Sequence, residues 1–273
     1  MSQGRLFSST VMIILTAGAI IQSWFFILFV MALTIGGLYE FFTMVKKKGI
    51  PIYSYVGIFI GAMIPASIYT RFELTRNWEL LFIVVAFLLI LLLQFARQDN
   101  SNAIVGIATT LFGVLYVAWF FSFLVKIRLL LPEPQGAKLL AFIVLVTKSG
   151  DIGALLVGSR LGRHPLLPKV SPHKSIEGSL GSFAFSIMAA ILSRSFLPVG
   201  LDFSIGHVVF IGAFLGGIGQ LGDLSESLIK RDGQVKDSGK LLPGMGGVLD
   251  VIDSLLFCAP AFYLYMSAAL NTI

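Results

Sequence analysis

Stretches of about twenty apolar residues recur along the whole chain of 273 residues. Each stretch is long enough to cross roughly 30 Å of hydrocarbon as a helix, and the stretches are continuous rather than alternating, which argues against a β-barrel. Only 12% of the residues are charged, about half of the fraction that is usual in soluble domains. The pattern predicts an all-α, polytopic integral membrane protein with about nine transmembrane helices. We expect these spans near residues 6–21, 23–45, 52–70, 78–96, 103–125, 137–157, 179–198, 205–229 and 247–270.

The basic residues are divided unequally between the two sides that nine spans define. Thirteen of the twenty Lys and Arg residues fall in the N-terminus and in the loops after the even-numbered spans, and six fall on the opposite side. Since basic loops stay in the cytoplasm, we expect the N-terminus and the large even loops there, in a multi-pass protein of the plasma or inner membrane. The first apolar run is interpreted as an uncleaved span rather than a signal peptide.

The net charge of +6 does not indicate a nucleic-acid partner. Basic loops of this size are what a positive-inside topology produces, and such loops attract anionic membrane lipids. The single cysteine, Cys258, excludes an intrachain disulfide and a multi-cysteine metal site. We expect it to be inert packing within an apolar span.

The character of the chain changes at the turn-rich segment 132–136. Residues 1–135 are expected to form N-terminal membrane helices that line a lipid cavity, make dimer contacts, or do both. Their spans hold almost no charge, and Glu40, the exception, is expected to reach the membrane interface. Residues 136–273 are expected to form a catalytic membrane region with cytoplasmic loops at 158–178 and 230–246.

The segment 222–253 holds six of the fourteen acidic residues and four of the basic ones. Asp223 and Glu226 are three apart, as are Asp250 and Asp253, so each pair shares a helix face. Two such helices side by side bring several carboxylates to one point, and oxygen ligands of this kind suit Mg²⁺. A solvated loop with capping aspartates is the alternative. It explains the lysines between the pairs easily, but the second pair poorly.

Two other polar groups precede this segment. Lys148 and Asp151 share a helix face, and the spacing leaves open whether they form an ion pair at the interface or line a cavity. The loop 158–178 mixes glycines, hydroxyl groups and cations and leads into an apolar span. A helix N-terminus with Lys174 beside it suits an anion, although Ser175 with Glu177 is also explained as a simple helix start.

The charged segment has a specific pattern over about twenty-seven positions. It resembles the C-terminal signature of the phosphatidate cytidylyltransferases, also called CDP-diacylglycerol synthases. The matching residues are Ser227, Lys230, Arg231, Lys236, Asp237, Gly239, Leu242, Pro243, Gly246, Gly247, Asp250 and Asp253. Residues 151–154 and 171–178 resemble two upstream elements of the same family, so the resemblance covers about residues 148–260.

The chain departs from the family pattern at four positions. Met245 stands where the signature has a histidine, and Val251 stands where it has an arginine. His173 and Ser175 occupy positions where lysine and threonine are usual. The losses at 245 and 251 put in doubt any role that needs that histidine or arginine, and they leave the carboxylates intact.

The resemblance implies transfer of a cytidylyl group from CTP to phosphatidate, giving CDP-diacylglycerol and pyrophosphate. It implies Mg²⁺ as the cofactor and leaves open a second metal ion. It implies that Asp223, Asp250 and Asp253 hold the metal and that Lys230, Arg231, Lys236 and Lys240 contact the triphosphate. Asp237 would orient a lysine or a metal-bound water, and Asp151 would line the cavity or position Lys174. The expected catalytic residues are Asp223, Lys230, Arg231, Asp237, Asp250 and Asp253, and the expected substrate-binding residues are Ser171, Lys174, Ser175, Lys236, Lys240 and Asp151.

Other functions fit parts of the same pattern. A transporter coupled to protons or cations also needs carboxylates within its membrane region, but it predicts charge near the bilayer midplane, whereas this chain places its charge near one face. Another CTP- or ATP-dependent lipid phosphotransferase or kinase would keep the metal site and change the donor. A homodimer is compatible with the sequence, which defines no interface for it.

Overall fold

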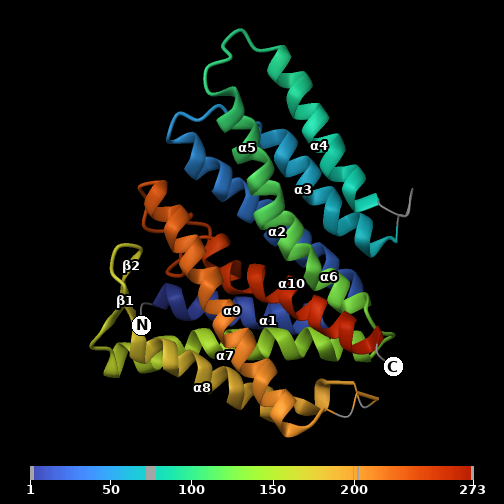
Figure 1. The fold of residues 1–273 in the computed structure, drawn as a ribbon, viewed down its shortest axis with the longest axis vertical. Helices are drawn as coiled ribbons and strands as arrows, with labels where there is room; N and C mark the ends of the chain where they lie inside the picture. Colours follow the sequence, from blue (N-terminus) through green and yellow to red (C-terminus); the bar gives the residue numbers. More distant parts are fainter. Residues whose placement is uncertain (1–2, 72–77, 199, 202, 272–273) are drawn as a thin grey trace. The chain divides into compact units, whose positions relative to one another are not determined.

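The computed structural model describes residues 3–71, 78–198, 200–201 and 203–271, and this part of the chain is mainly helical (Figure 1). Its first half contains α1 (Gln3–Ile21), α2 (Ser23–Lys46), α3 (Ser54–Tyr69), α4 (Trp78–Phe95), α5 (Ala103–Gly113), a π-helical segment η1 (Val114–Trp119) and α6 (Phe120–Leu129). Its second half contains α7 (Gln135–Leu161), β1 (Pro165–Leu167), β2 (Ser171–Ser175), α8 (Ile176–Leu192), the short 3-10 helix η2 (Arg194–Phe196), α9 (Ile205–Asp232) and α10 (Leu249–Asn271).

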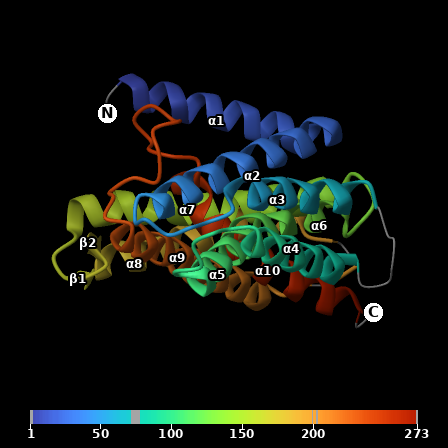
Figure 2. The same ribbon diagram turned by 90° about the horizontal axis from the view of Figure 1, so that it is seen from above.

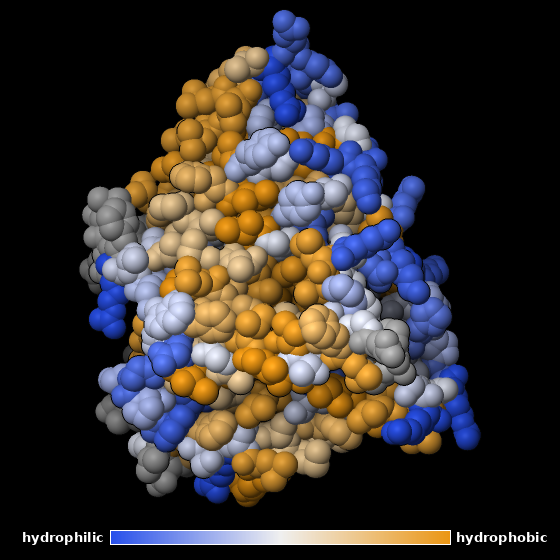
Figure 3. Space-filling view, turned by 180° about the vertical axis from the view of Figure 1, so that it is seen from behind, coloured by the Kyte–Doolittle hydropathy of each residue, from blue (hydrophilic) through white to orange (hydrophobic). Residues whose placement is uncertain are grey.

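The helices are apolar enough for a membrane protein. Five helical segments in the described residues have the length and composition to cross a bilayer: Ser23–Lys46, Ala103–Leu129, Gln135–Leu161, Ile205–Asp232 and Leu249–Leu270. Four shorter apolar helices coincide with the remaining predicted spans. Apolar side chains also cover much of the face in Figure 3. The prediction of an all-α, multi-pass membrane protein is confirmed, while the orientation of its N-terminus stays a prediction.

The chain forms two compact units, and each is discontinuous in sequence. Unit 1 consists of Met1–Val125 and Gly233–Val251, and unit 2 consists of Lys126–Asp232 and Ile252–Ile273. The segment between α9 and α10 therefore belongs with the N-terminal helices. The predicted division at residue 135 did not include this return of the chain, and the roles predicted for the two parts stay predictions.

Unit 1 is built around α2. Gln22 separates α1 from α2, and the two helices diverge from this junction (Figure 2). Phe41 and Phe42 of α2 are almost fully buried, and Phe41 contacts the rings of Phe112 and Tyr116 from the α5–η1 segment. The predicted span 103–125 is thus helical, but a π-helical turn interrupts it. Hydropathy could not reveal this turn, because the apolar pattern continues through it.

Unit 2 is built from α7, α8 and α9 together with most of α10. Phe262 of α10 stacks on Phe142 of α7. Close packing of α7 on α8 depends on small residues, since a Cβ added at Gly181 would lie 2.6 Å from Val157 Cβ. The connection between these helices holds an antiparallel hairpin, in which Pro165 pairs with Ser175 and Leu167 with Ser171 around an irregularity. The sequence predicts only a loop here. The strands could not be recognised in the sequence because residues 165–172 contain three prolines and the hairpin is short.

Candidate active site

Unit 2 contains a cavity of about 280 Å³ where the hairpin meets the helices around it. Four residues of the predicted site line this cavity together: Asp151, Lys174, Ser175 and Asp223. The remaining lining residues are Ala154, Leu155, Gly158, Ser159, Leu166, His173, Gly178, Ser179, Gln220 and Leu224. The cavity wall therefore combines α7, the hairpin, the N-terminus of α8 and part of α9.

The N-terminus of α8 is held in place by side chains of the hairpin region. Ser175 is the N-cap residue, and its Oγ accepts a hydrogen bond from the backbone N–H of Gly178 at 3.0 Å. A capping hydroxyl of this kind satisfies one of the free N–H groups in the first helical turn. The interpretation of Ser175 as a helix start is confirmed. Its position in the cavity wall is compatible with the predicted phosphate contact, which stays a prediction.

Glu177 ties the end of α7 to the start of α8. Its Oε2 accepts hydrogen bonds from the backbone N–H groups of Arg163 and His164, at 3.0 and 3.3 Å, and its Oε1 lies 2.6 Å from Nδ1 of His164. The backbone N–H of Arg163 and the side chain of His164 lower the pKa of Glu177 to about 2. The loop that carries the cationic residues thus has a fixed anchor outside the predicted span 179–198.

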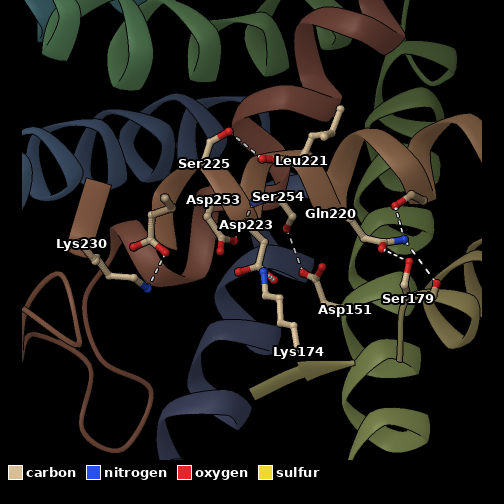
Figure 4. A network of polar contacts seen from close by, with 12 residues as sticks. Asp151, Lys174, Ser179, Gln220, Leu221, Asp223, Ser225, Lys230, Asp253 and Ser254 are labelled. Carbon is tan, nitrogen blue, oxygen red and sulfur yellow. Dashed lines mark hydrogen bonds and ion pairs between the residues drawn. The ribbon is translucent and has the colours of Figure 1, made fainter. Parts of the chain in front are cut away.

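Lys174 and Asp223 form an ion pair across the cavity wall. The Nζ atom of Lys174 on β2 lies 2.6 Å from Oδ2 of Asp223 on α9, and both side chains remain partly exposed. Figure 4 shows the lysine extending toward the aspartate from the hairpin. A cation and a carboxylate in this arrangement can separate when an anionic ligand and a metal ion compete for them.

Three carboxylates converge beside this ion pair. Oxygen atoms of Asp223, Glu226 and Asp253 lie within 4.8 Å of one another, and Glu226 and Asp253 are buried. The Nζ atom of Lys230 lies 2.6 Å from Oε2 of Glu226. Close approach of α9 to α10 is allowed by Gly222, where an added Cβ would meet the carbonyl oxygen of Asp253 at 2.5 Å.

This group fits a divalent cation. Three carboxylates at such distances repel one another, and oxygen ligands are the kind that Mg²⁺ prefers. Asp223 and Asp253 were predicted as metal ligands. Glu226 was not included in that set, although its spacing from Asp223 had placed the two on one helix face, and this spacing is the signal that could have found it.

Lys148 and Asp151 form a partly exposed extension of the site. Lys148 Nζ donates to Asp151 Oδ2 at 2.8 Å and to Ser254 Oγ at 2.9 Å, and Ser254 Oγ donates to Asp151 Oδ2 at 2.8 Å. The two predictions for this pair are therefore both correct in part. It is an ion pair, and its aspartate also lines the cavity.

The other predicted residues are distributed over both units. In unit 2, Ser171 begins β2, and Arg231 Nε donates to the carbonyl of Val170 at 3.3 Å. In unit 1, Lys236, Asp237 and Lys240 are exposed on the segment that precedes α10. Their predicted contacts with substrate stay predictions.

Asp250 belongs to unit 1 and already has several hydrogen-bond donors. Its Oδ2 accepts from the backbone N–H of Ser238 at 3.0 Å, from Ser238 Oγ at 2.9 Å and from the N–H of Gly247 at 2.7 Å. These contacts fix the direction of the carboxylate. Its assignment as a metal ligand stays a prediction.

The structure corrects the prediction that Glu40 reaches the membrane interface. Its side chain is buried, and it accepts hydrogen bonds from Ser238 Oγ and from the N–H groups of Val248 and Leu249. Its donors lie about two hundred positions away in the sequence, so local context could not reveal them. The only signal was the presence of a charge in an otherwise apolar span.

The chain matches the model of the Cytidylyltransferase family over residues 3–269. It is 32% identical over 231 residues to a phosphatidate cytidylyltransferase of Bacillus subtilis (strain 168), with 84% of each chain covered. It is 31% identical over 271 residues to a protein of the same name from Synechocystis sp. (strain ATCC 27184 / PCC 6803 / Kazusa), with 90% of each covered. A phosphatidate cytidylyltransferase of Staphylococcus epidermidis (strain ATCC 12228 / FDA PCI 1200) is 35% identical over 177 residues, 65% of each chain.

Proposed function

The chain belongs to the cytidylyltransferase family, and we propose that it transfers the cytidylyl group of CTP to phosphatidate, giving CDP-diacylglycerol and pyrophosphate. The names of its relatives support this pair of substrates. The single observation that carries the proposal within the structure is the carboxylate group of Asp223, Glu226 and Asp253 beside a cavity that also contains Lys174. Opposite charges at one cavity suit a metal ion and phosphate groups together.

Asp223, Glu226 and Asp253 are the proposed holders of Mg²⁺ in unit 2, with Asp250 as a further candidate. When bound, the ion would neutralise charge on the phosphate groups and stabilise the charge that develops on the departing pyrophosphate. The residues suit this role through their oxygen donors and their close spacing.

The proposed reaction does not require the protein to transfer a proton. The nucleophile is a phosphate oxygen of the lipid, which is already anionic near neutral pH, so no general base is required. A bond forms between this oxygen and the α-phosphorus of CTP, and the bond from the α-phosphorus to the bridging oxygen of pyrophosphate breaks. Lys174, Lys230, Arg231, Lys236 and Lys240 are the proposed cations that neutralise the phosphates and align the attack.

The proposed active site faces the cytoplasm at the inner or plasma membrane. The unequal division of Lys and Arg supports this orientation, and CTP is a cytoplasmic substrate while phosphatidate resides in the bilayer. Lipid would therefore enter sideways from the membrane. The apolar surface of the helices supports such an approach (Figure 3).

The position of the label tests the reaction. Purified full-length protein in detergent would receive phosphatidate, Mg²⁺ and CTP that is labelled at either the α- or the γ-phosphate. The proposal predicts α-label in the lipid fraction and γ-label in pyrophosphate. A lipid kinase would instead place γ-label in the lipid, and a transporter would leave both labels in CTP. Either of these results overturns the proposal.

A further inference from the structure

The buried carboxylate of Glu40 has a role that the metal and phosphate contacts do not explain. Glu40 lies on α2, is 3% exposed, and belongs to unit 1 together with the segment 233–251. A charged group is rarely retained in an apolar helix unless it is hydrogen-bonded. Its partners therefore show what it does.

Glu40 binds the backbone at the start of α10. Its Oε1 accepts the N–H of Val248 at 3.0 Å, and its Oε2 accepts the N–H of Leu249, the first residue of α10, at 3.0 Å. The N–H groups at a helix start have no partner within the helix and need one from outside. A side chain from α2 thus supplies the cap for a helix that begins two hundred residues later.

The same carboxylate is linked to Asp250 by Ser238. Ser238 Oγ lies 3.0 Å from Glu40 Oε2 and 2.9 Å from Asp250 Oδ2. A hydroxyl group has a single proton to donate, so these two carboxylates share it. If a cation binds Asp250, the proton of Ser238 remains available to Glu40, which keeps Glu40 satisfied.

Two glycines of the segment 233–251 make room for the Glu40 carboxylate. A Cβ added at Gly239 or at Gly247 would collide with the Glu40 carboxylate. Because three hydrogen bonds hold this carboxylate, it cannot easily move aside. Both glycines belong to the signature pattern, and this contact gives a physical reason for glycine at each position in this chain.

We propose that Glu40 is a positioning residue for the nucleotide side of the reaction. Its carboxylate fixes the backbone of residues 238–249, and through Ser238 it fixes the direction of Asp250. Lys236 and Lys240 lie on or next to this fixed backbone, so their directions depend on it too. The catalytic part of this inference rests on the proposed function, and the structural part does not.

The test compares variants of the full-length protein in detergent. Glu40→Gln keeps the size of the side chain but turns an amide N–H₂ toward donors that need an acceptor. Ser238→Ala removes the hydroxyl bridge between Glu40 and Asp250 and keeps the backbone N–H that donates to Asp250. Thr34→Val is the matched control, because Thr34 is also buried on α2 and its hydroxyl donates only to the carbonyl of Val30 in its own helix, at 2.8 Å.

We expect Glu40→Gln to lower kcat/KM for CTP at least tenfold while KM for phosphatidate stays within twofold. Ser238→Ala should raise the Mg²⁺ concentration that gives half-maximal rate, and the double variant should be no worse than the more damaged single one. Amide hydrogen exchange should increase in residues 238–249. The control Thr34→Val should change none of these quantities.

Two results would overturn the proposal. One is a kcat/KM for CTP within twofold of wild type in both variants, with unchanged exchange in residues 238–249. The other is faster exchange throughout unit 1 with equal losses for both substrates, which would indicate a general structural role. If wild-type protein makes no CDP-lipid, the proposed function fails, and the exchange measurement still decides whether Glu40 holds the segment.

Discussion

The ammonium group of Lys174 lies 2.6 Å from Oδ2 of Asp223, so the two residues neutralise each other across the cavity wall. The lysine comes from the hairpin and the aspartate from α9. One was predicted to bind phosphate and the other to hold a metal ion. Their contact connects the two parts of the proposed site, and a phosphate group and a metal ion would compete for it.

Removal of the Lys174 charge should weaken substrate binding. We expect Lys174→Met to raise the KM of at least one phosphate-bearing substrate tenfold or more, because a cation at the cavity is lost. Initial rates with CTP and phosphatidate varied in turn would identify which one. Lys169→Met is the control, since Lys169 is an exposed lysine of the same hairpin. Equal losses in both variants would contradict a specific role for Lys174.

Loss of a single carboxylate should nearly abolish turnover. Asp223→Asn and Asp253→Asn should each lower kcat at least a hundredfold, which corresponds to about 3 kcal/mol of transition-state stabilisation. Asp99→Asn, in a loop of unit 1 where Asp99 contacts Ser101, should keep wild-type activity. Full turnover in both site variants would show that the metal assignment is wrong even though the family is right.

Metal binding should be visible in stability as well as in activity. An ion that binds only the folded protein stabilises it by about 2.7 kcal/mol at a hundred times its Kd. Mg²⁺ should therefore raise the Tm of the EDTA-treated protein, and the increase should be lost in Asp253→Asn. A Tm that rises equally in the variant would place the stabilising ion elsewhere.

The ion pair between the buried Glu226 and the partly buried Lys230 should respond differently to single and double substitution. Lys230→Met leaves the buried Glu226 carboxylate without the ammonium 2.6 Å away, which should cost about 3 kcal/mol of unfolding free energy. Adding Glu226→Gln removes the buried charge and should restore much of that loss. Denaturant unfolding in detergent measures both, and an additive loss in the double variant would contradict the expected coupling.

Glu177 provides a prediction for pH. Its folded-state pKa of about 2 lies below the ordinary value of 4.5, so the stabilisation it provides is present above pH 4.5 and is lost as the pH falls toward 2. Glu177→Gln should speed amide exchange at Arg163 and His164 at pH 7. The difference from wild type should shrink through this acidic range, and a difference that grew there would contradict the assignment.

The helices could be predicted from the sequence because each membrane-spanning helix requires a continuous apolar stretch. All nine spans correspond to helical segments, and even the end of α2 at Lys46 lies within one residue of the prediction. The π-helical turn at Val114–Trp119 and the hairpin at residues 165–175 were missed. Both depend on packing and backbone pairing, which leave no mark in the apolar pattern.

The site was predicted where neighbouring residues in the sequence share its chemistry. Asp223 and Asp253 were identified from spacing and from the family pattern, and they meet in the structure. Glu226 follows the same spacing but was left out of the predicted ligands. Glu40 could not be found in this way, because its role depends on a segment 198 to 209 residues away.

The return of the chain to unit 1 has a consequence for biosynthesis. α2 leaves the ribosome long before Ser238, Val248 and Leu249 are translated. An acidic residue in the centre of an inserting helix costs about 2.5–3.5 kcal/mol. Glu40 lies nearer the end of α2 than its centre, so its cost is smaller, but it has to be inserted before its folded-state donors exist. The early helices therefore complete their assembly only when the last loop has been made, so a chain that is cut short after α9 retains an uncompensated acid in its first unit.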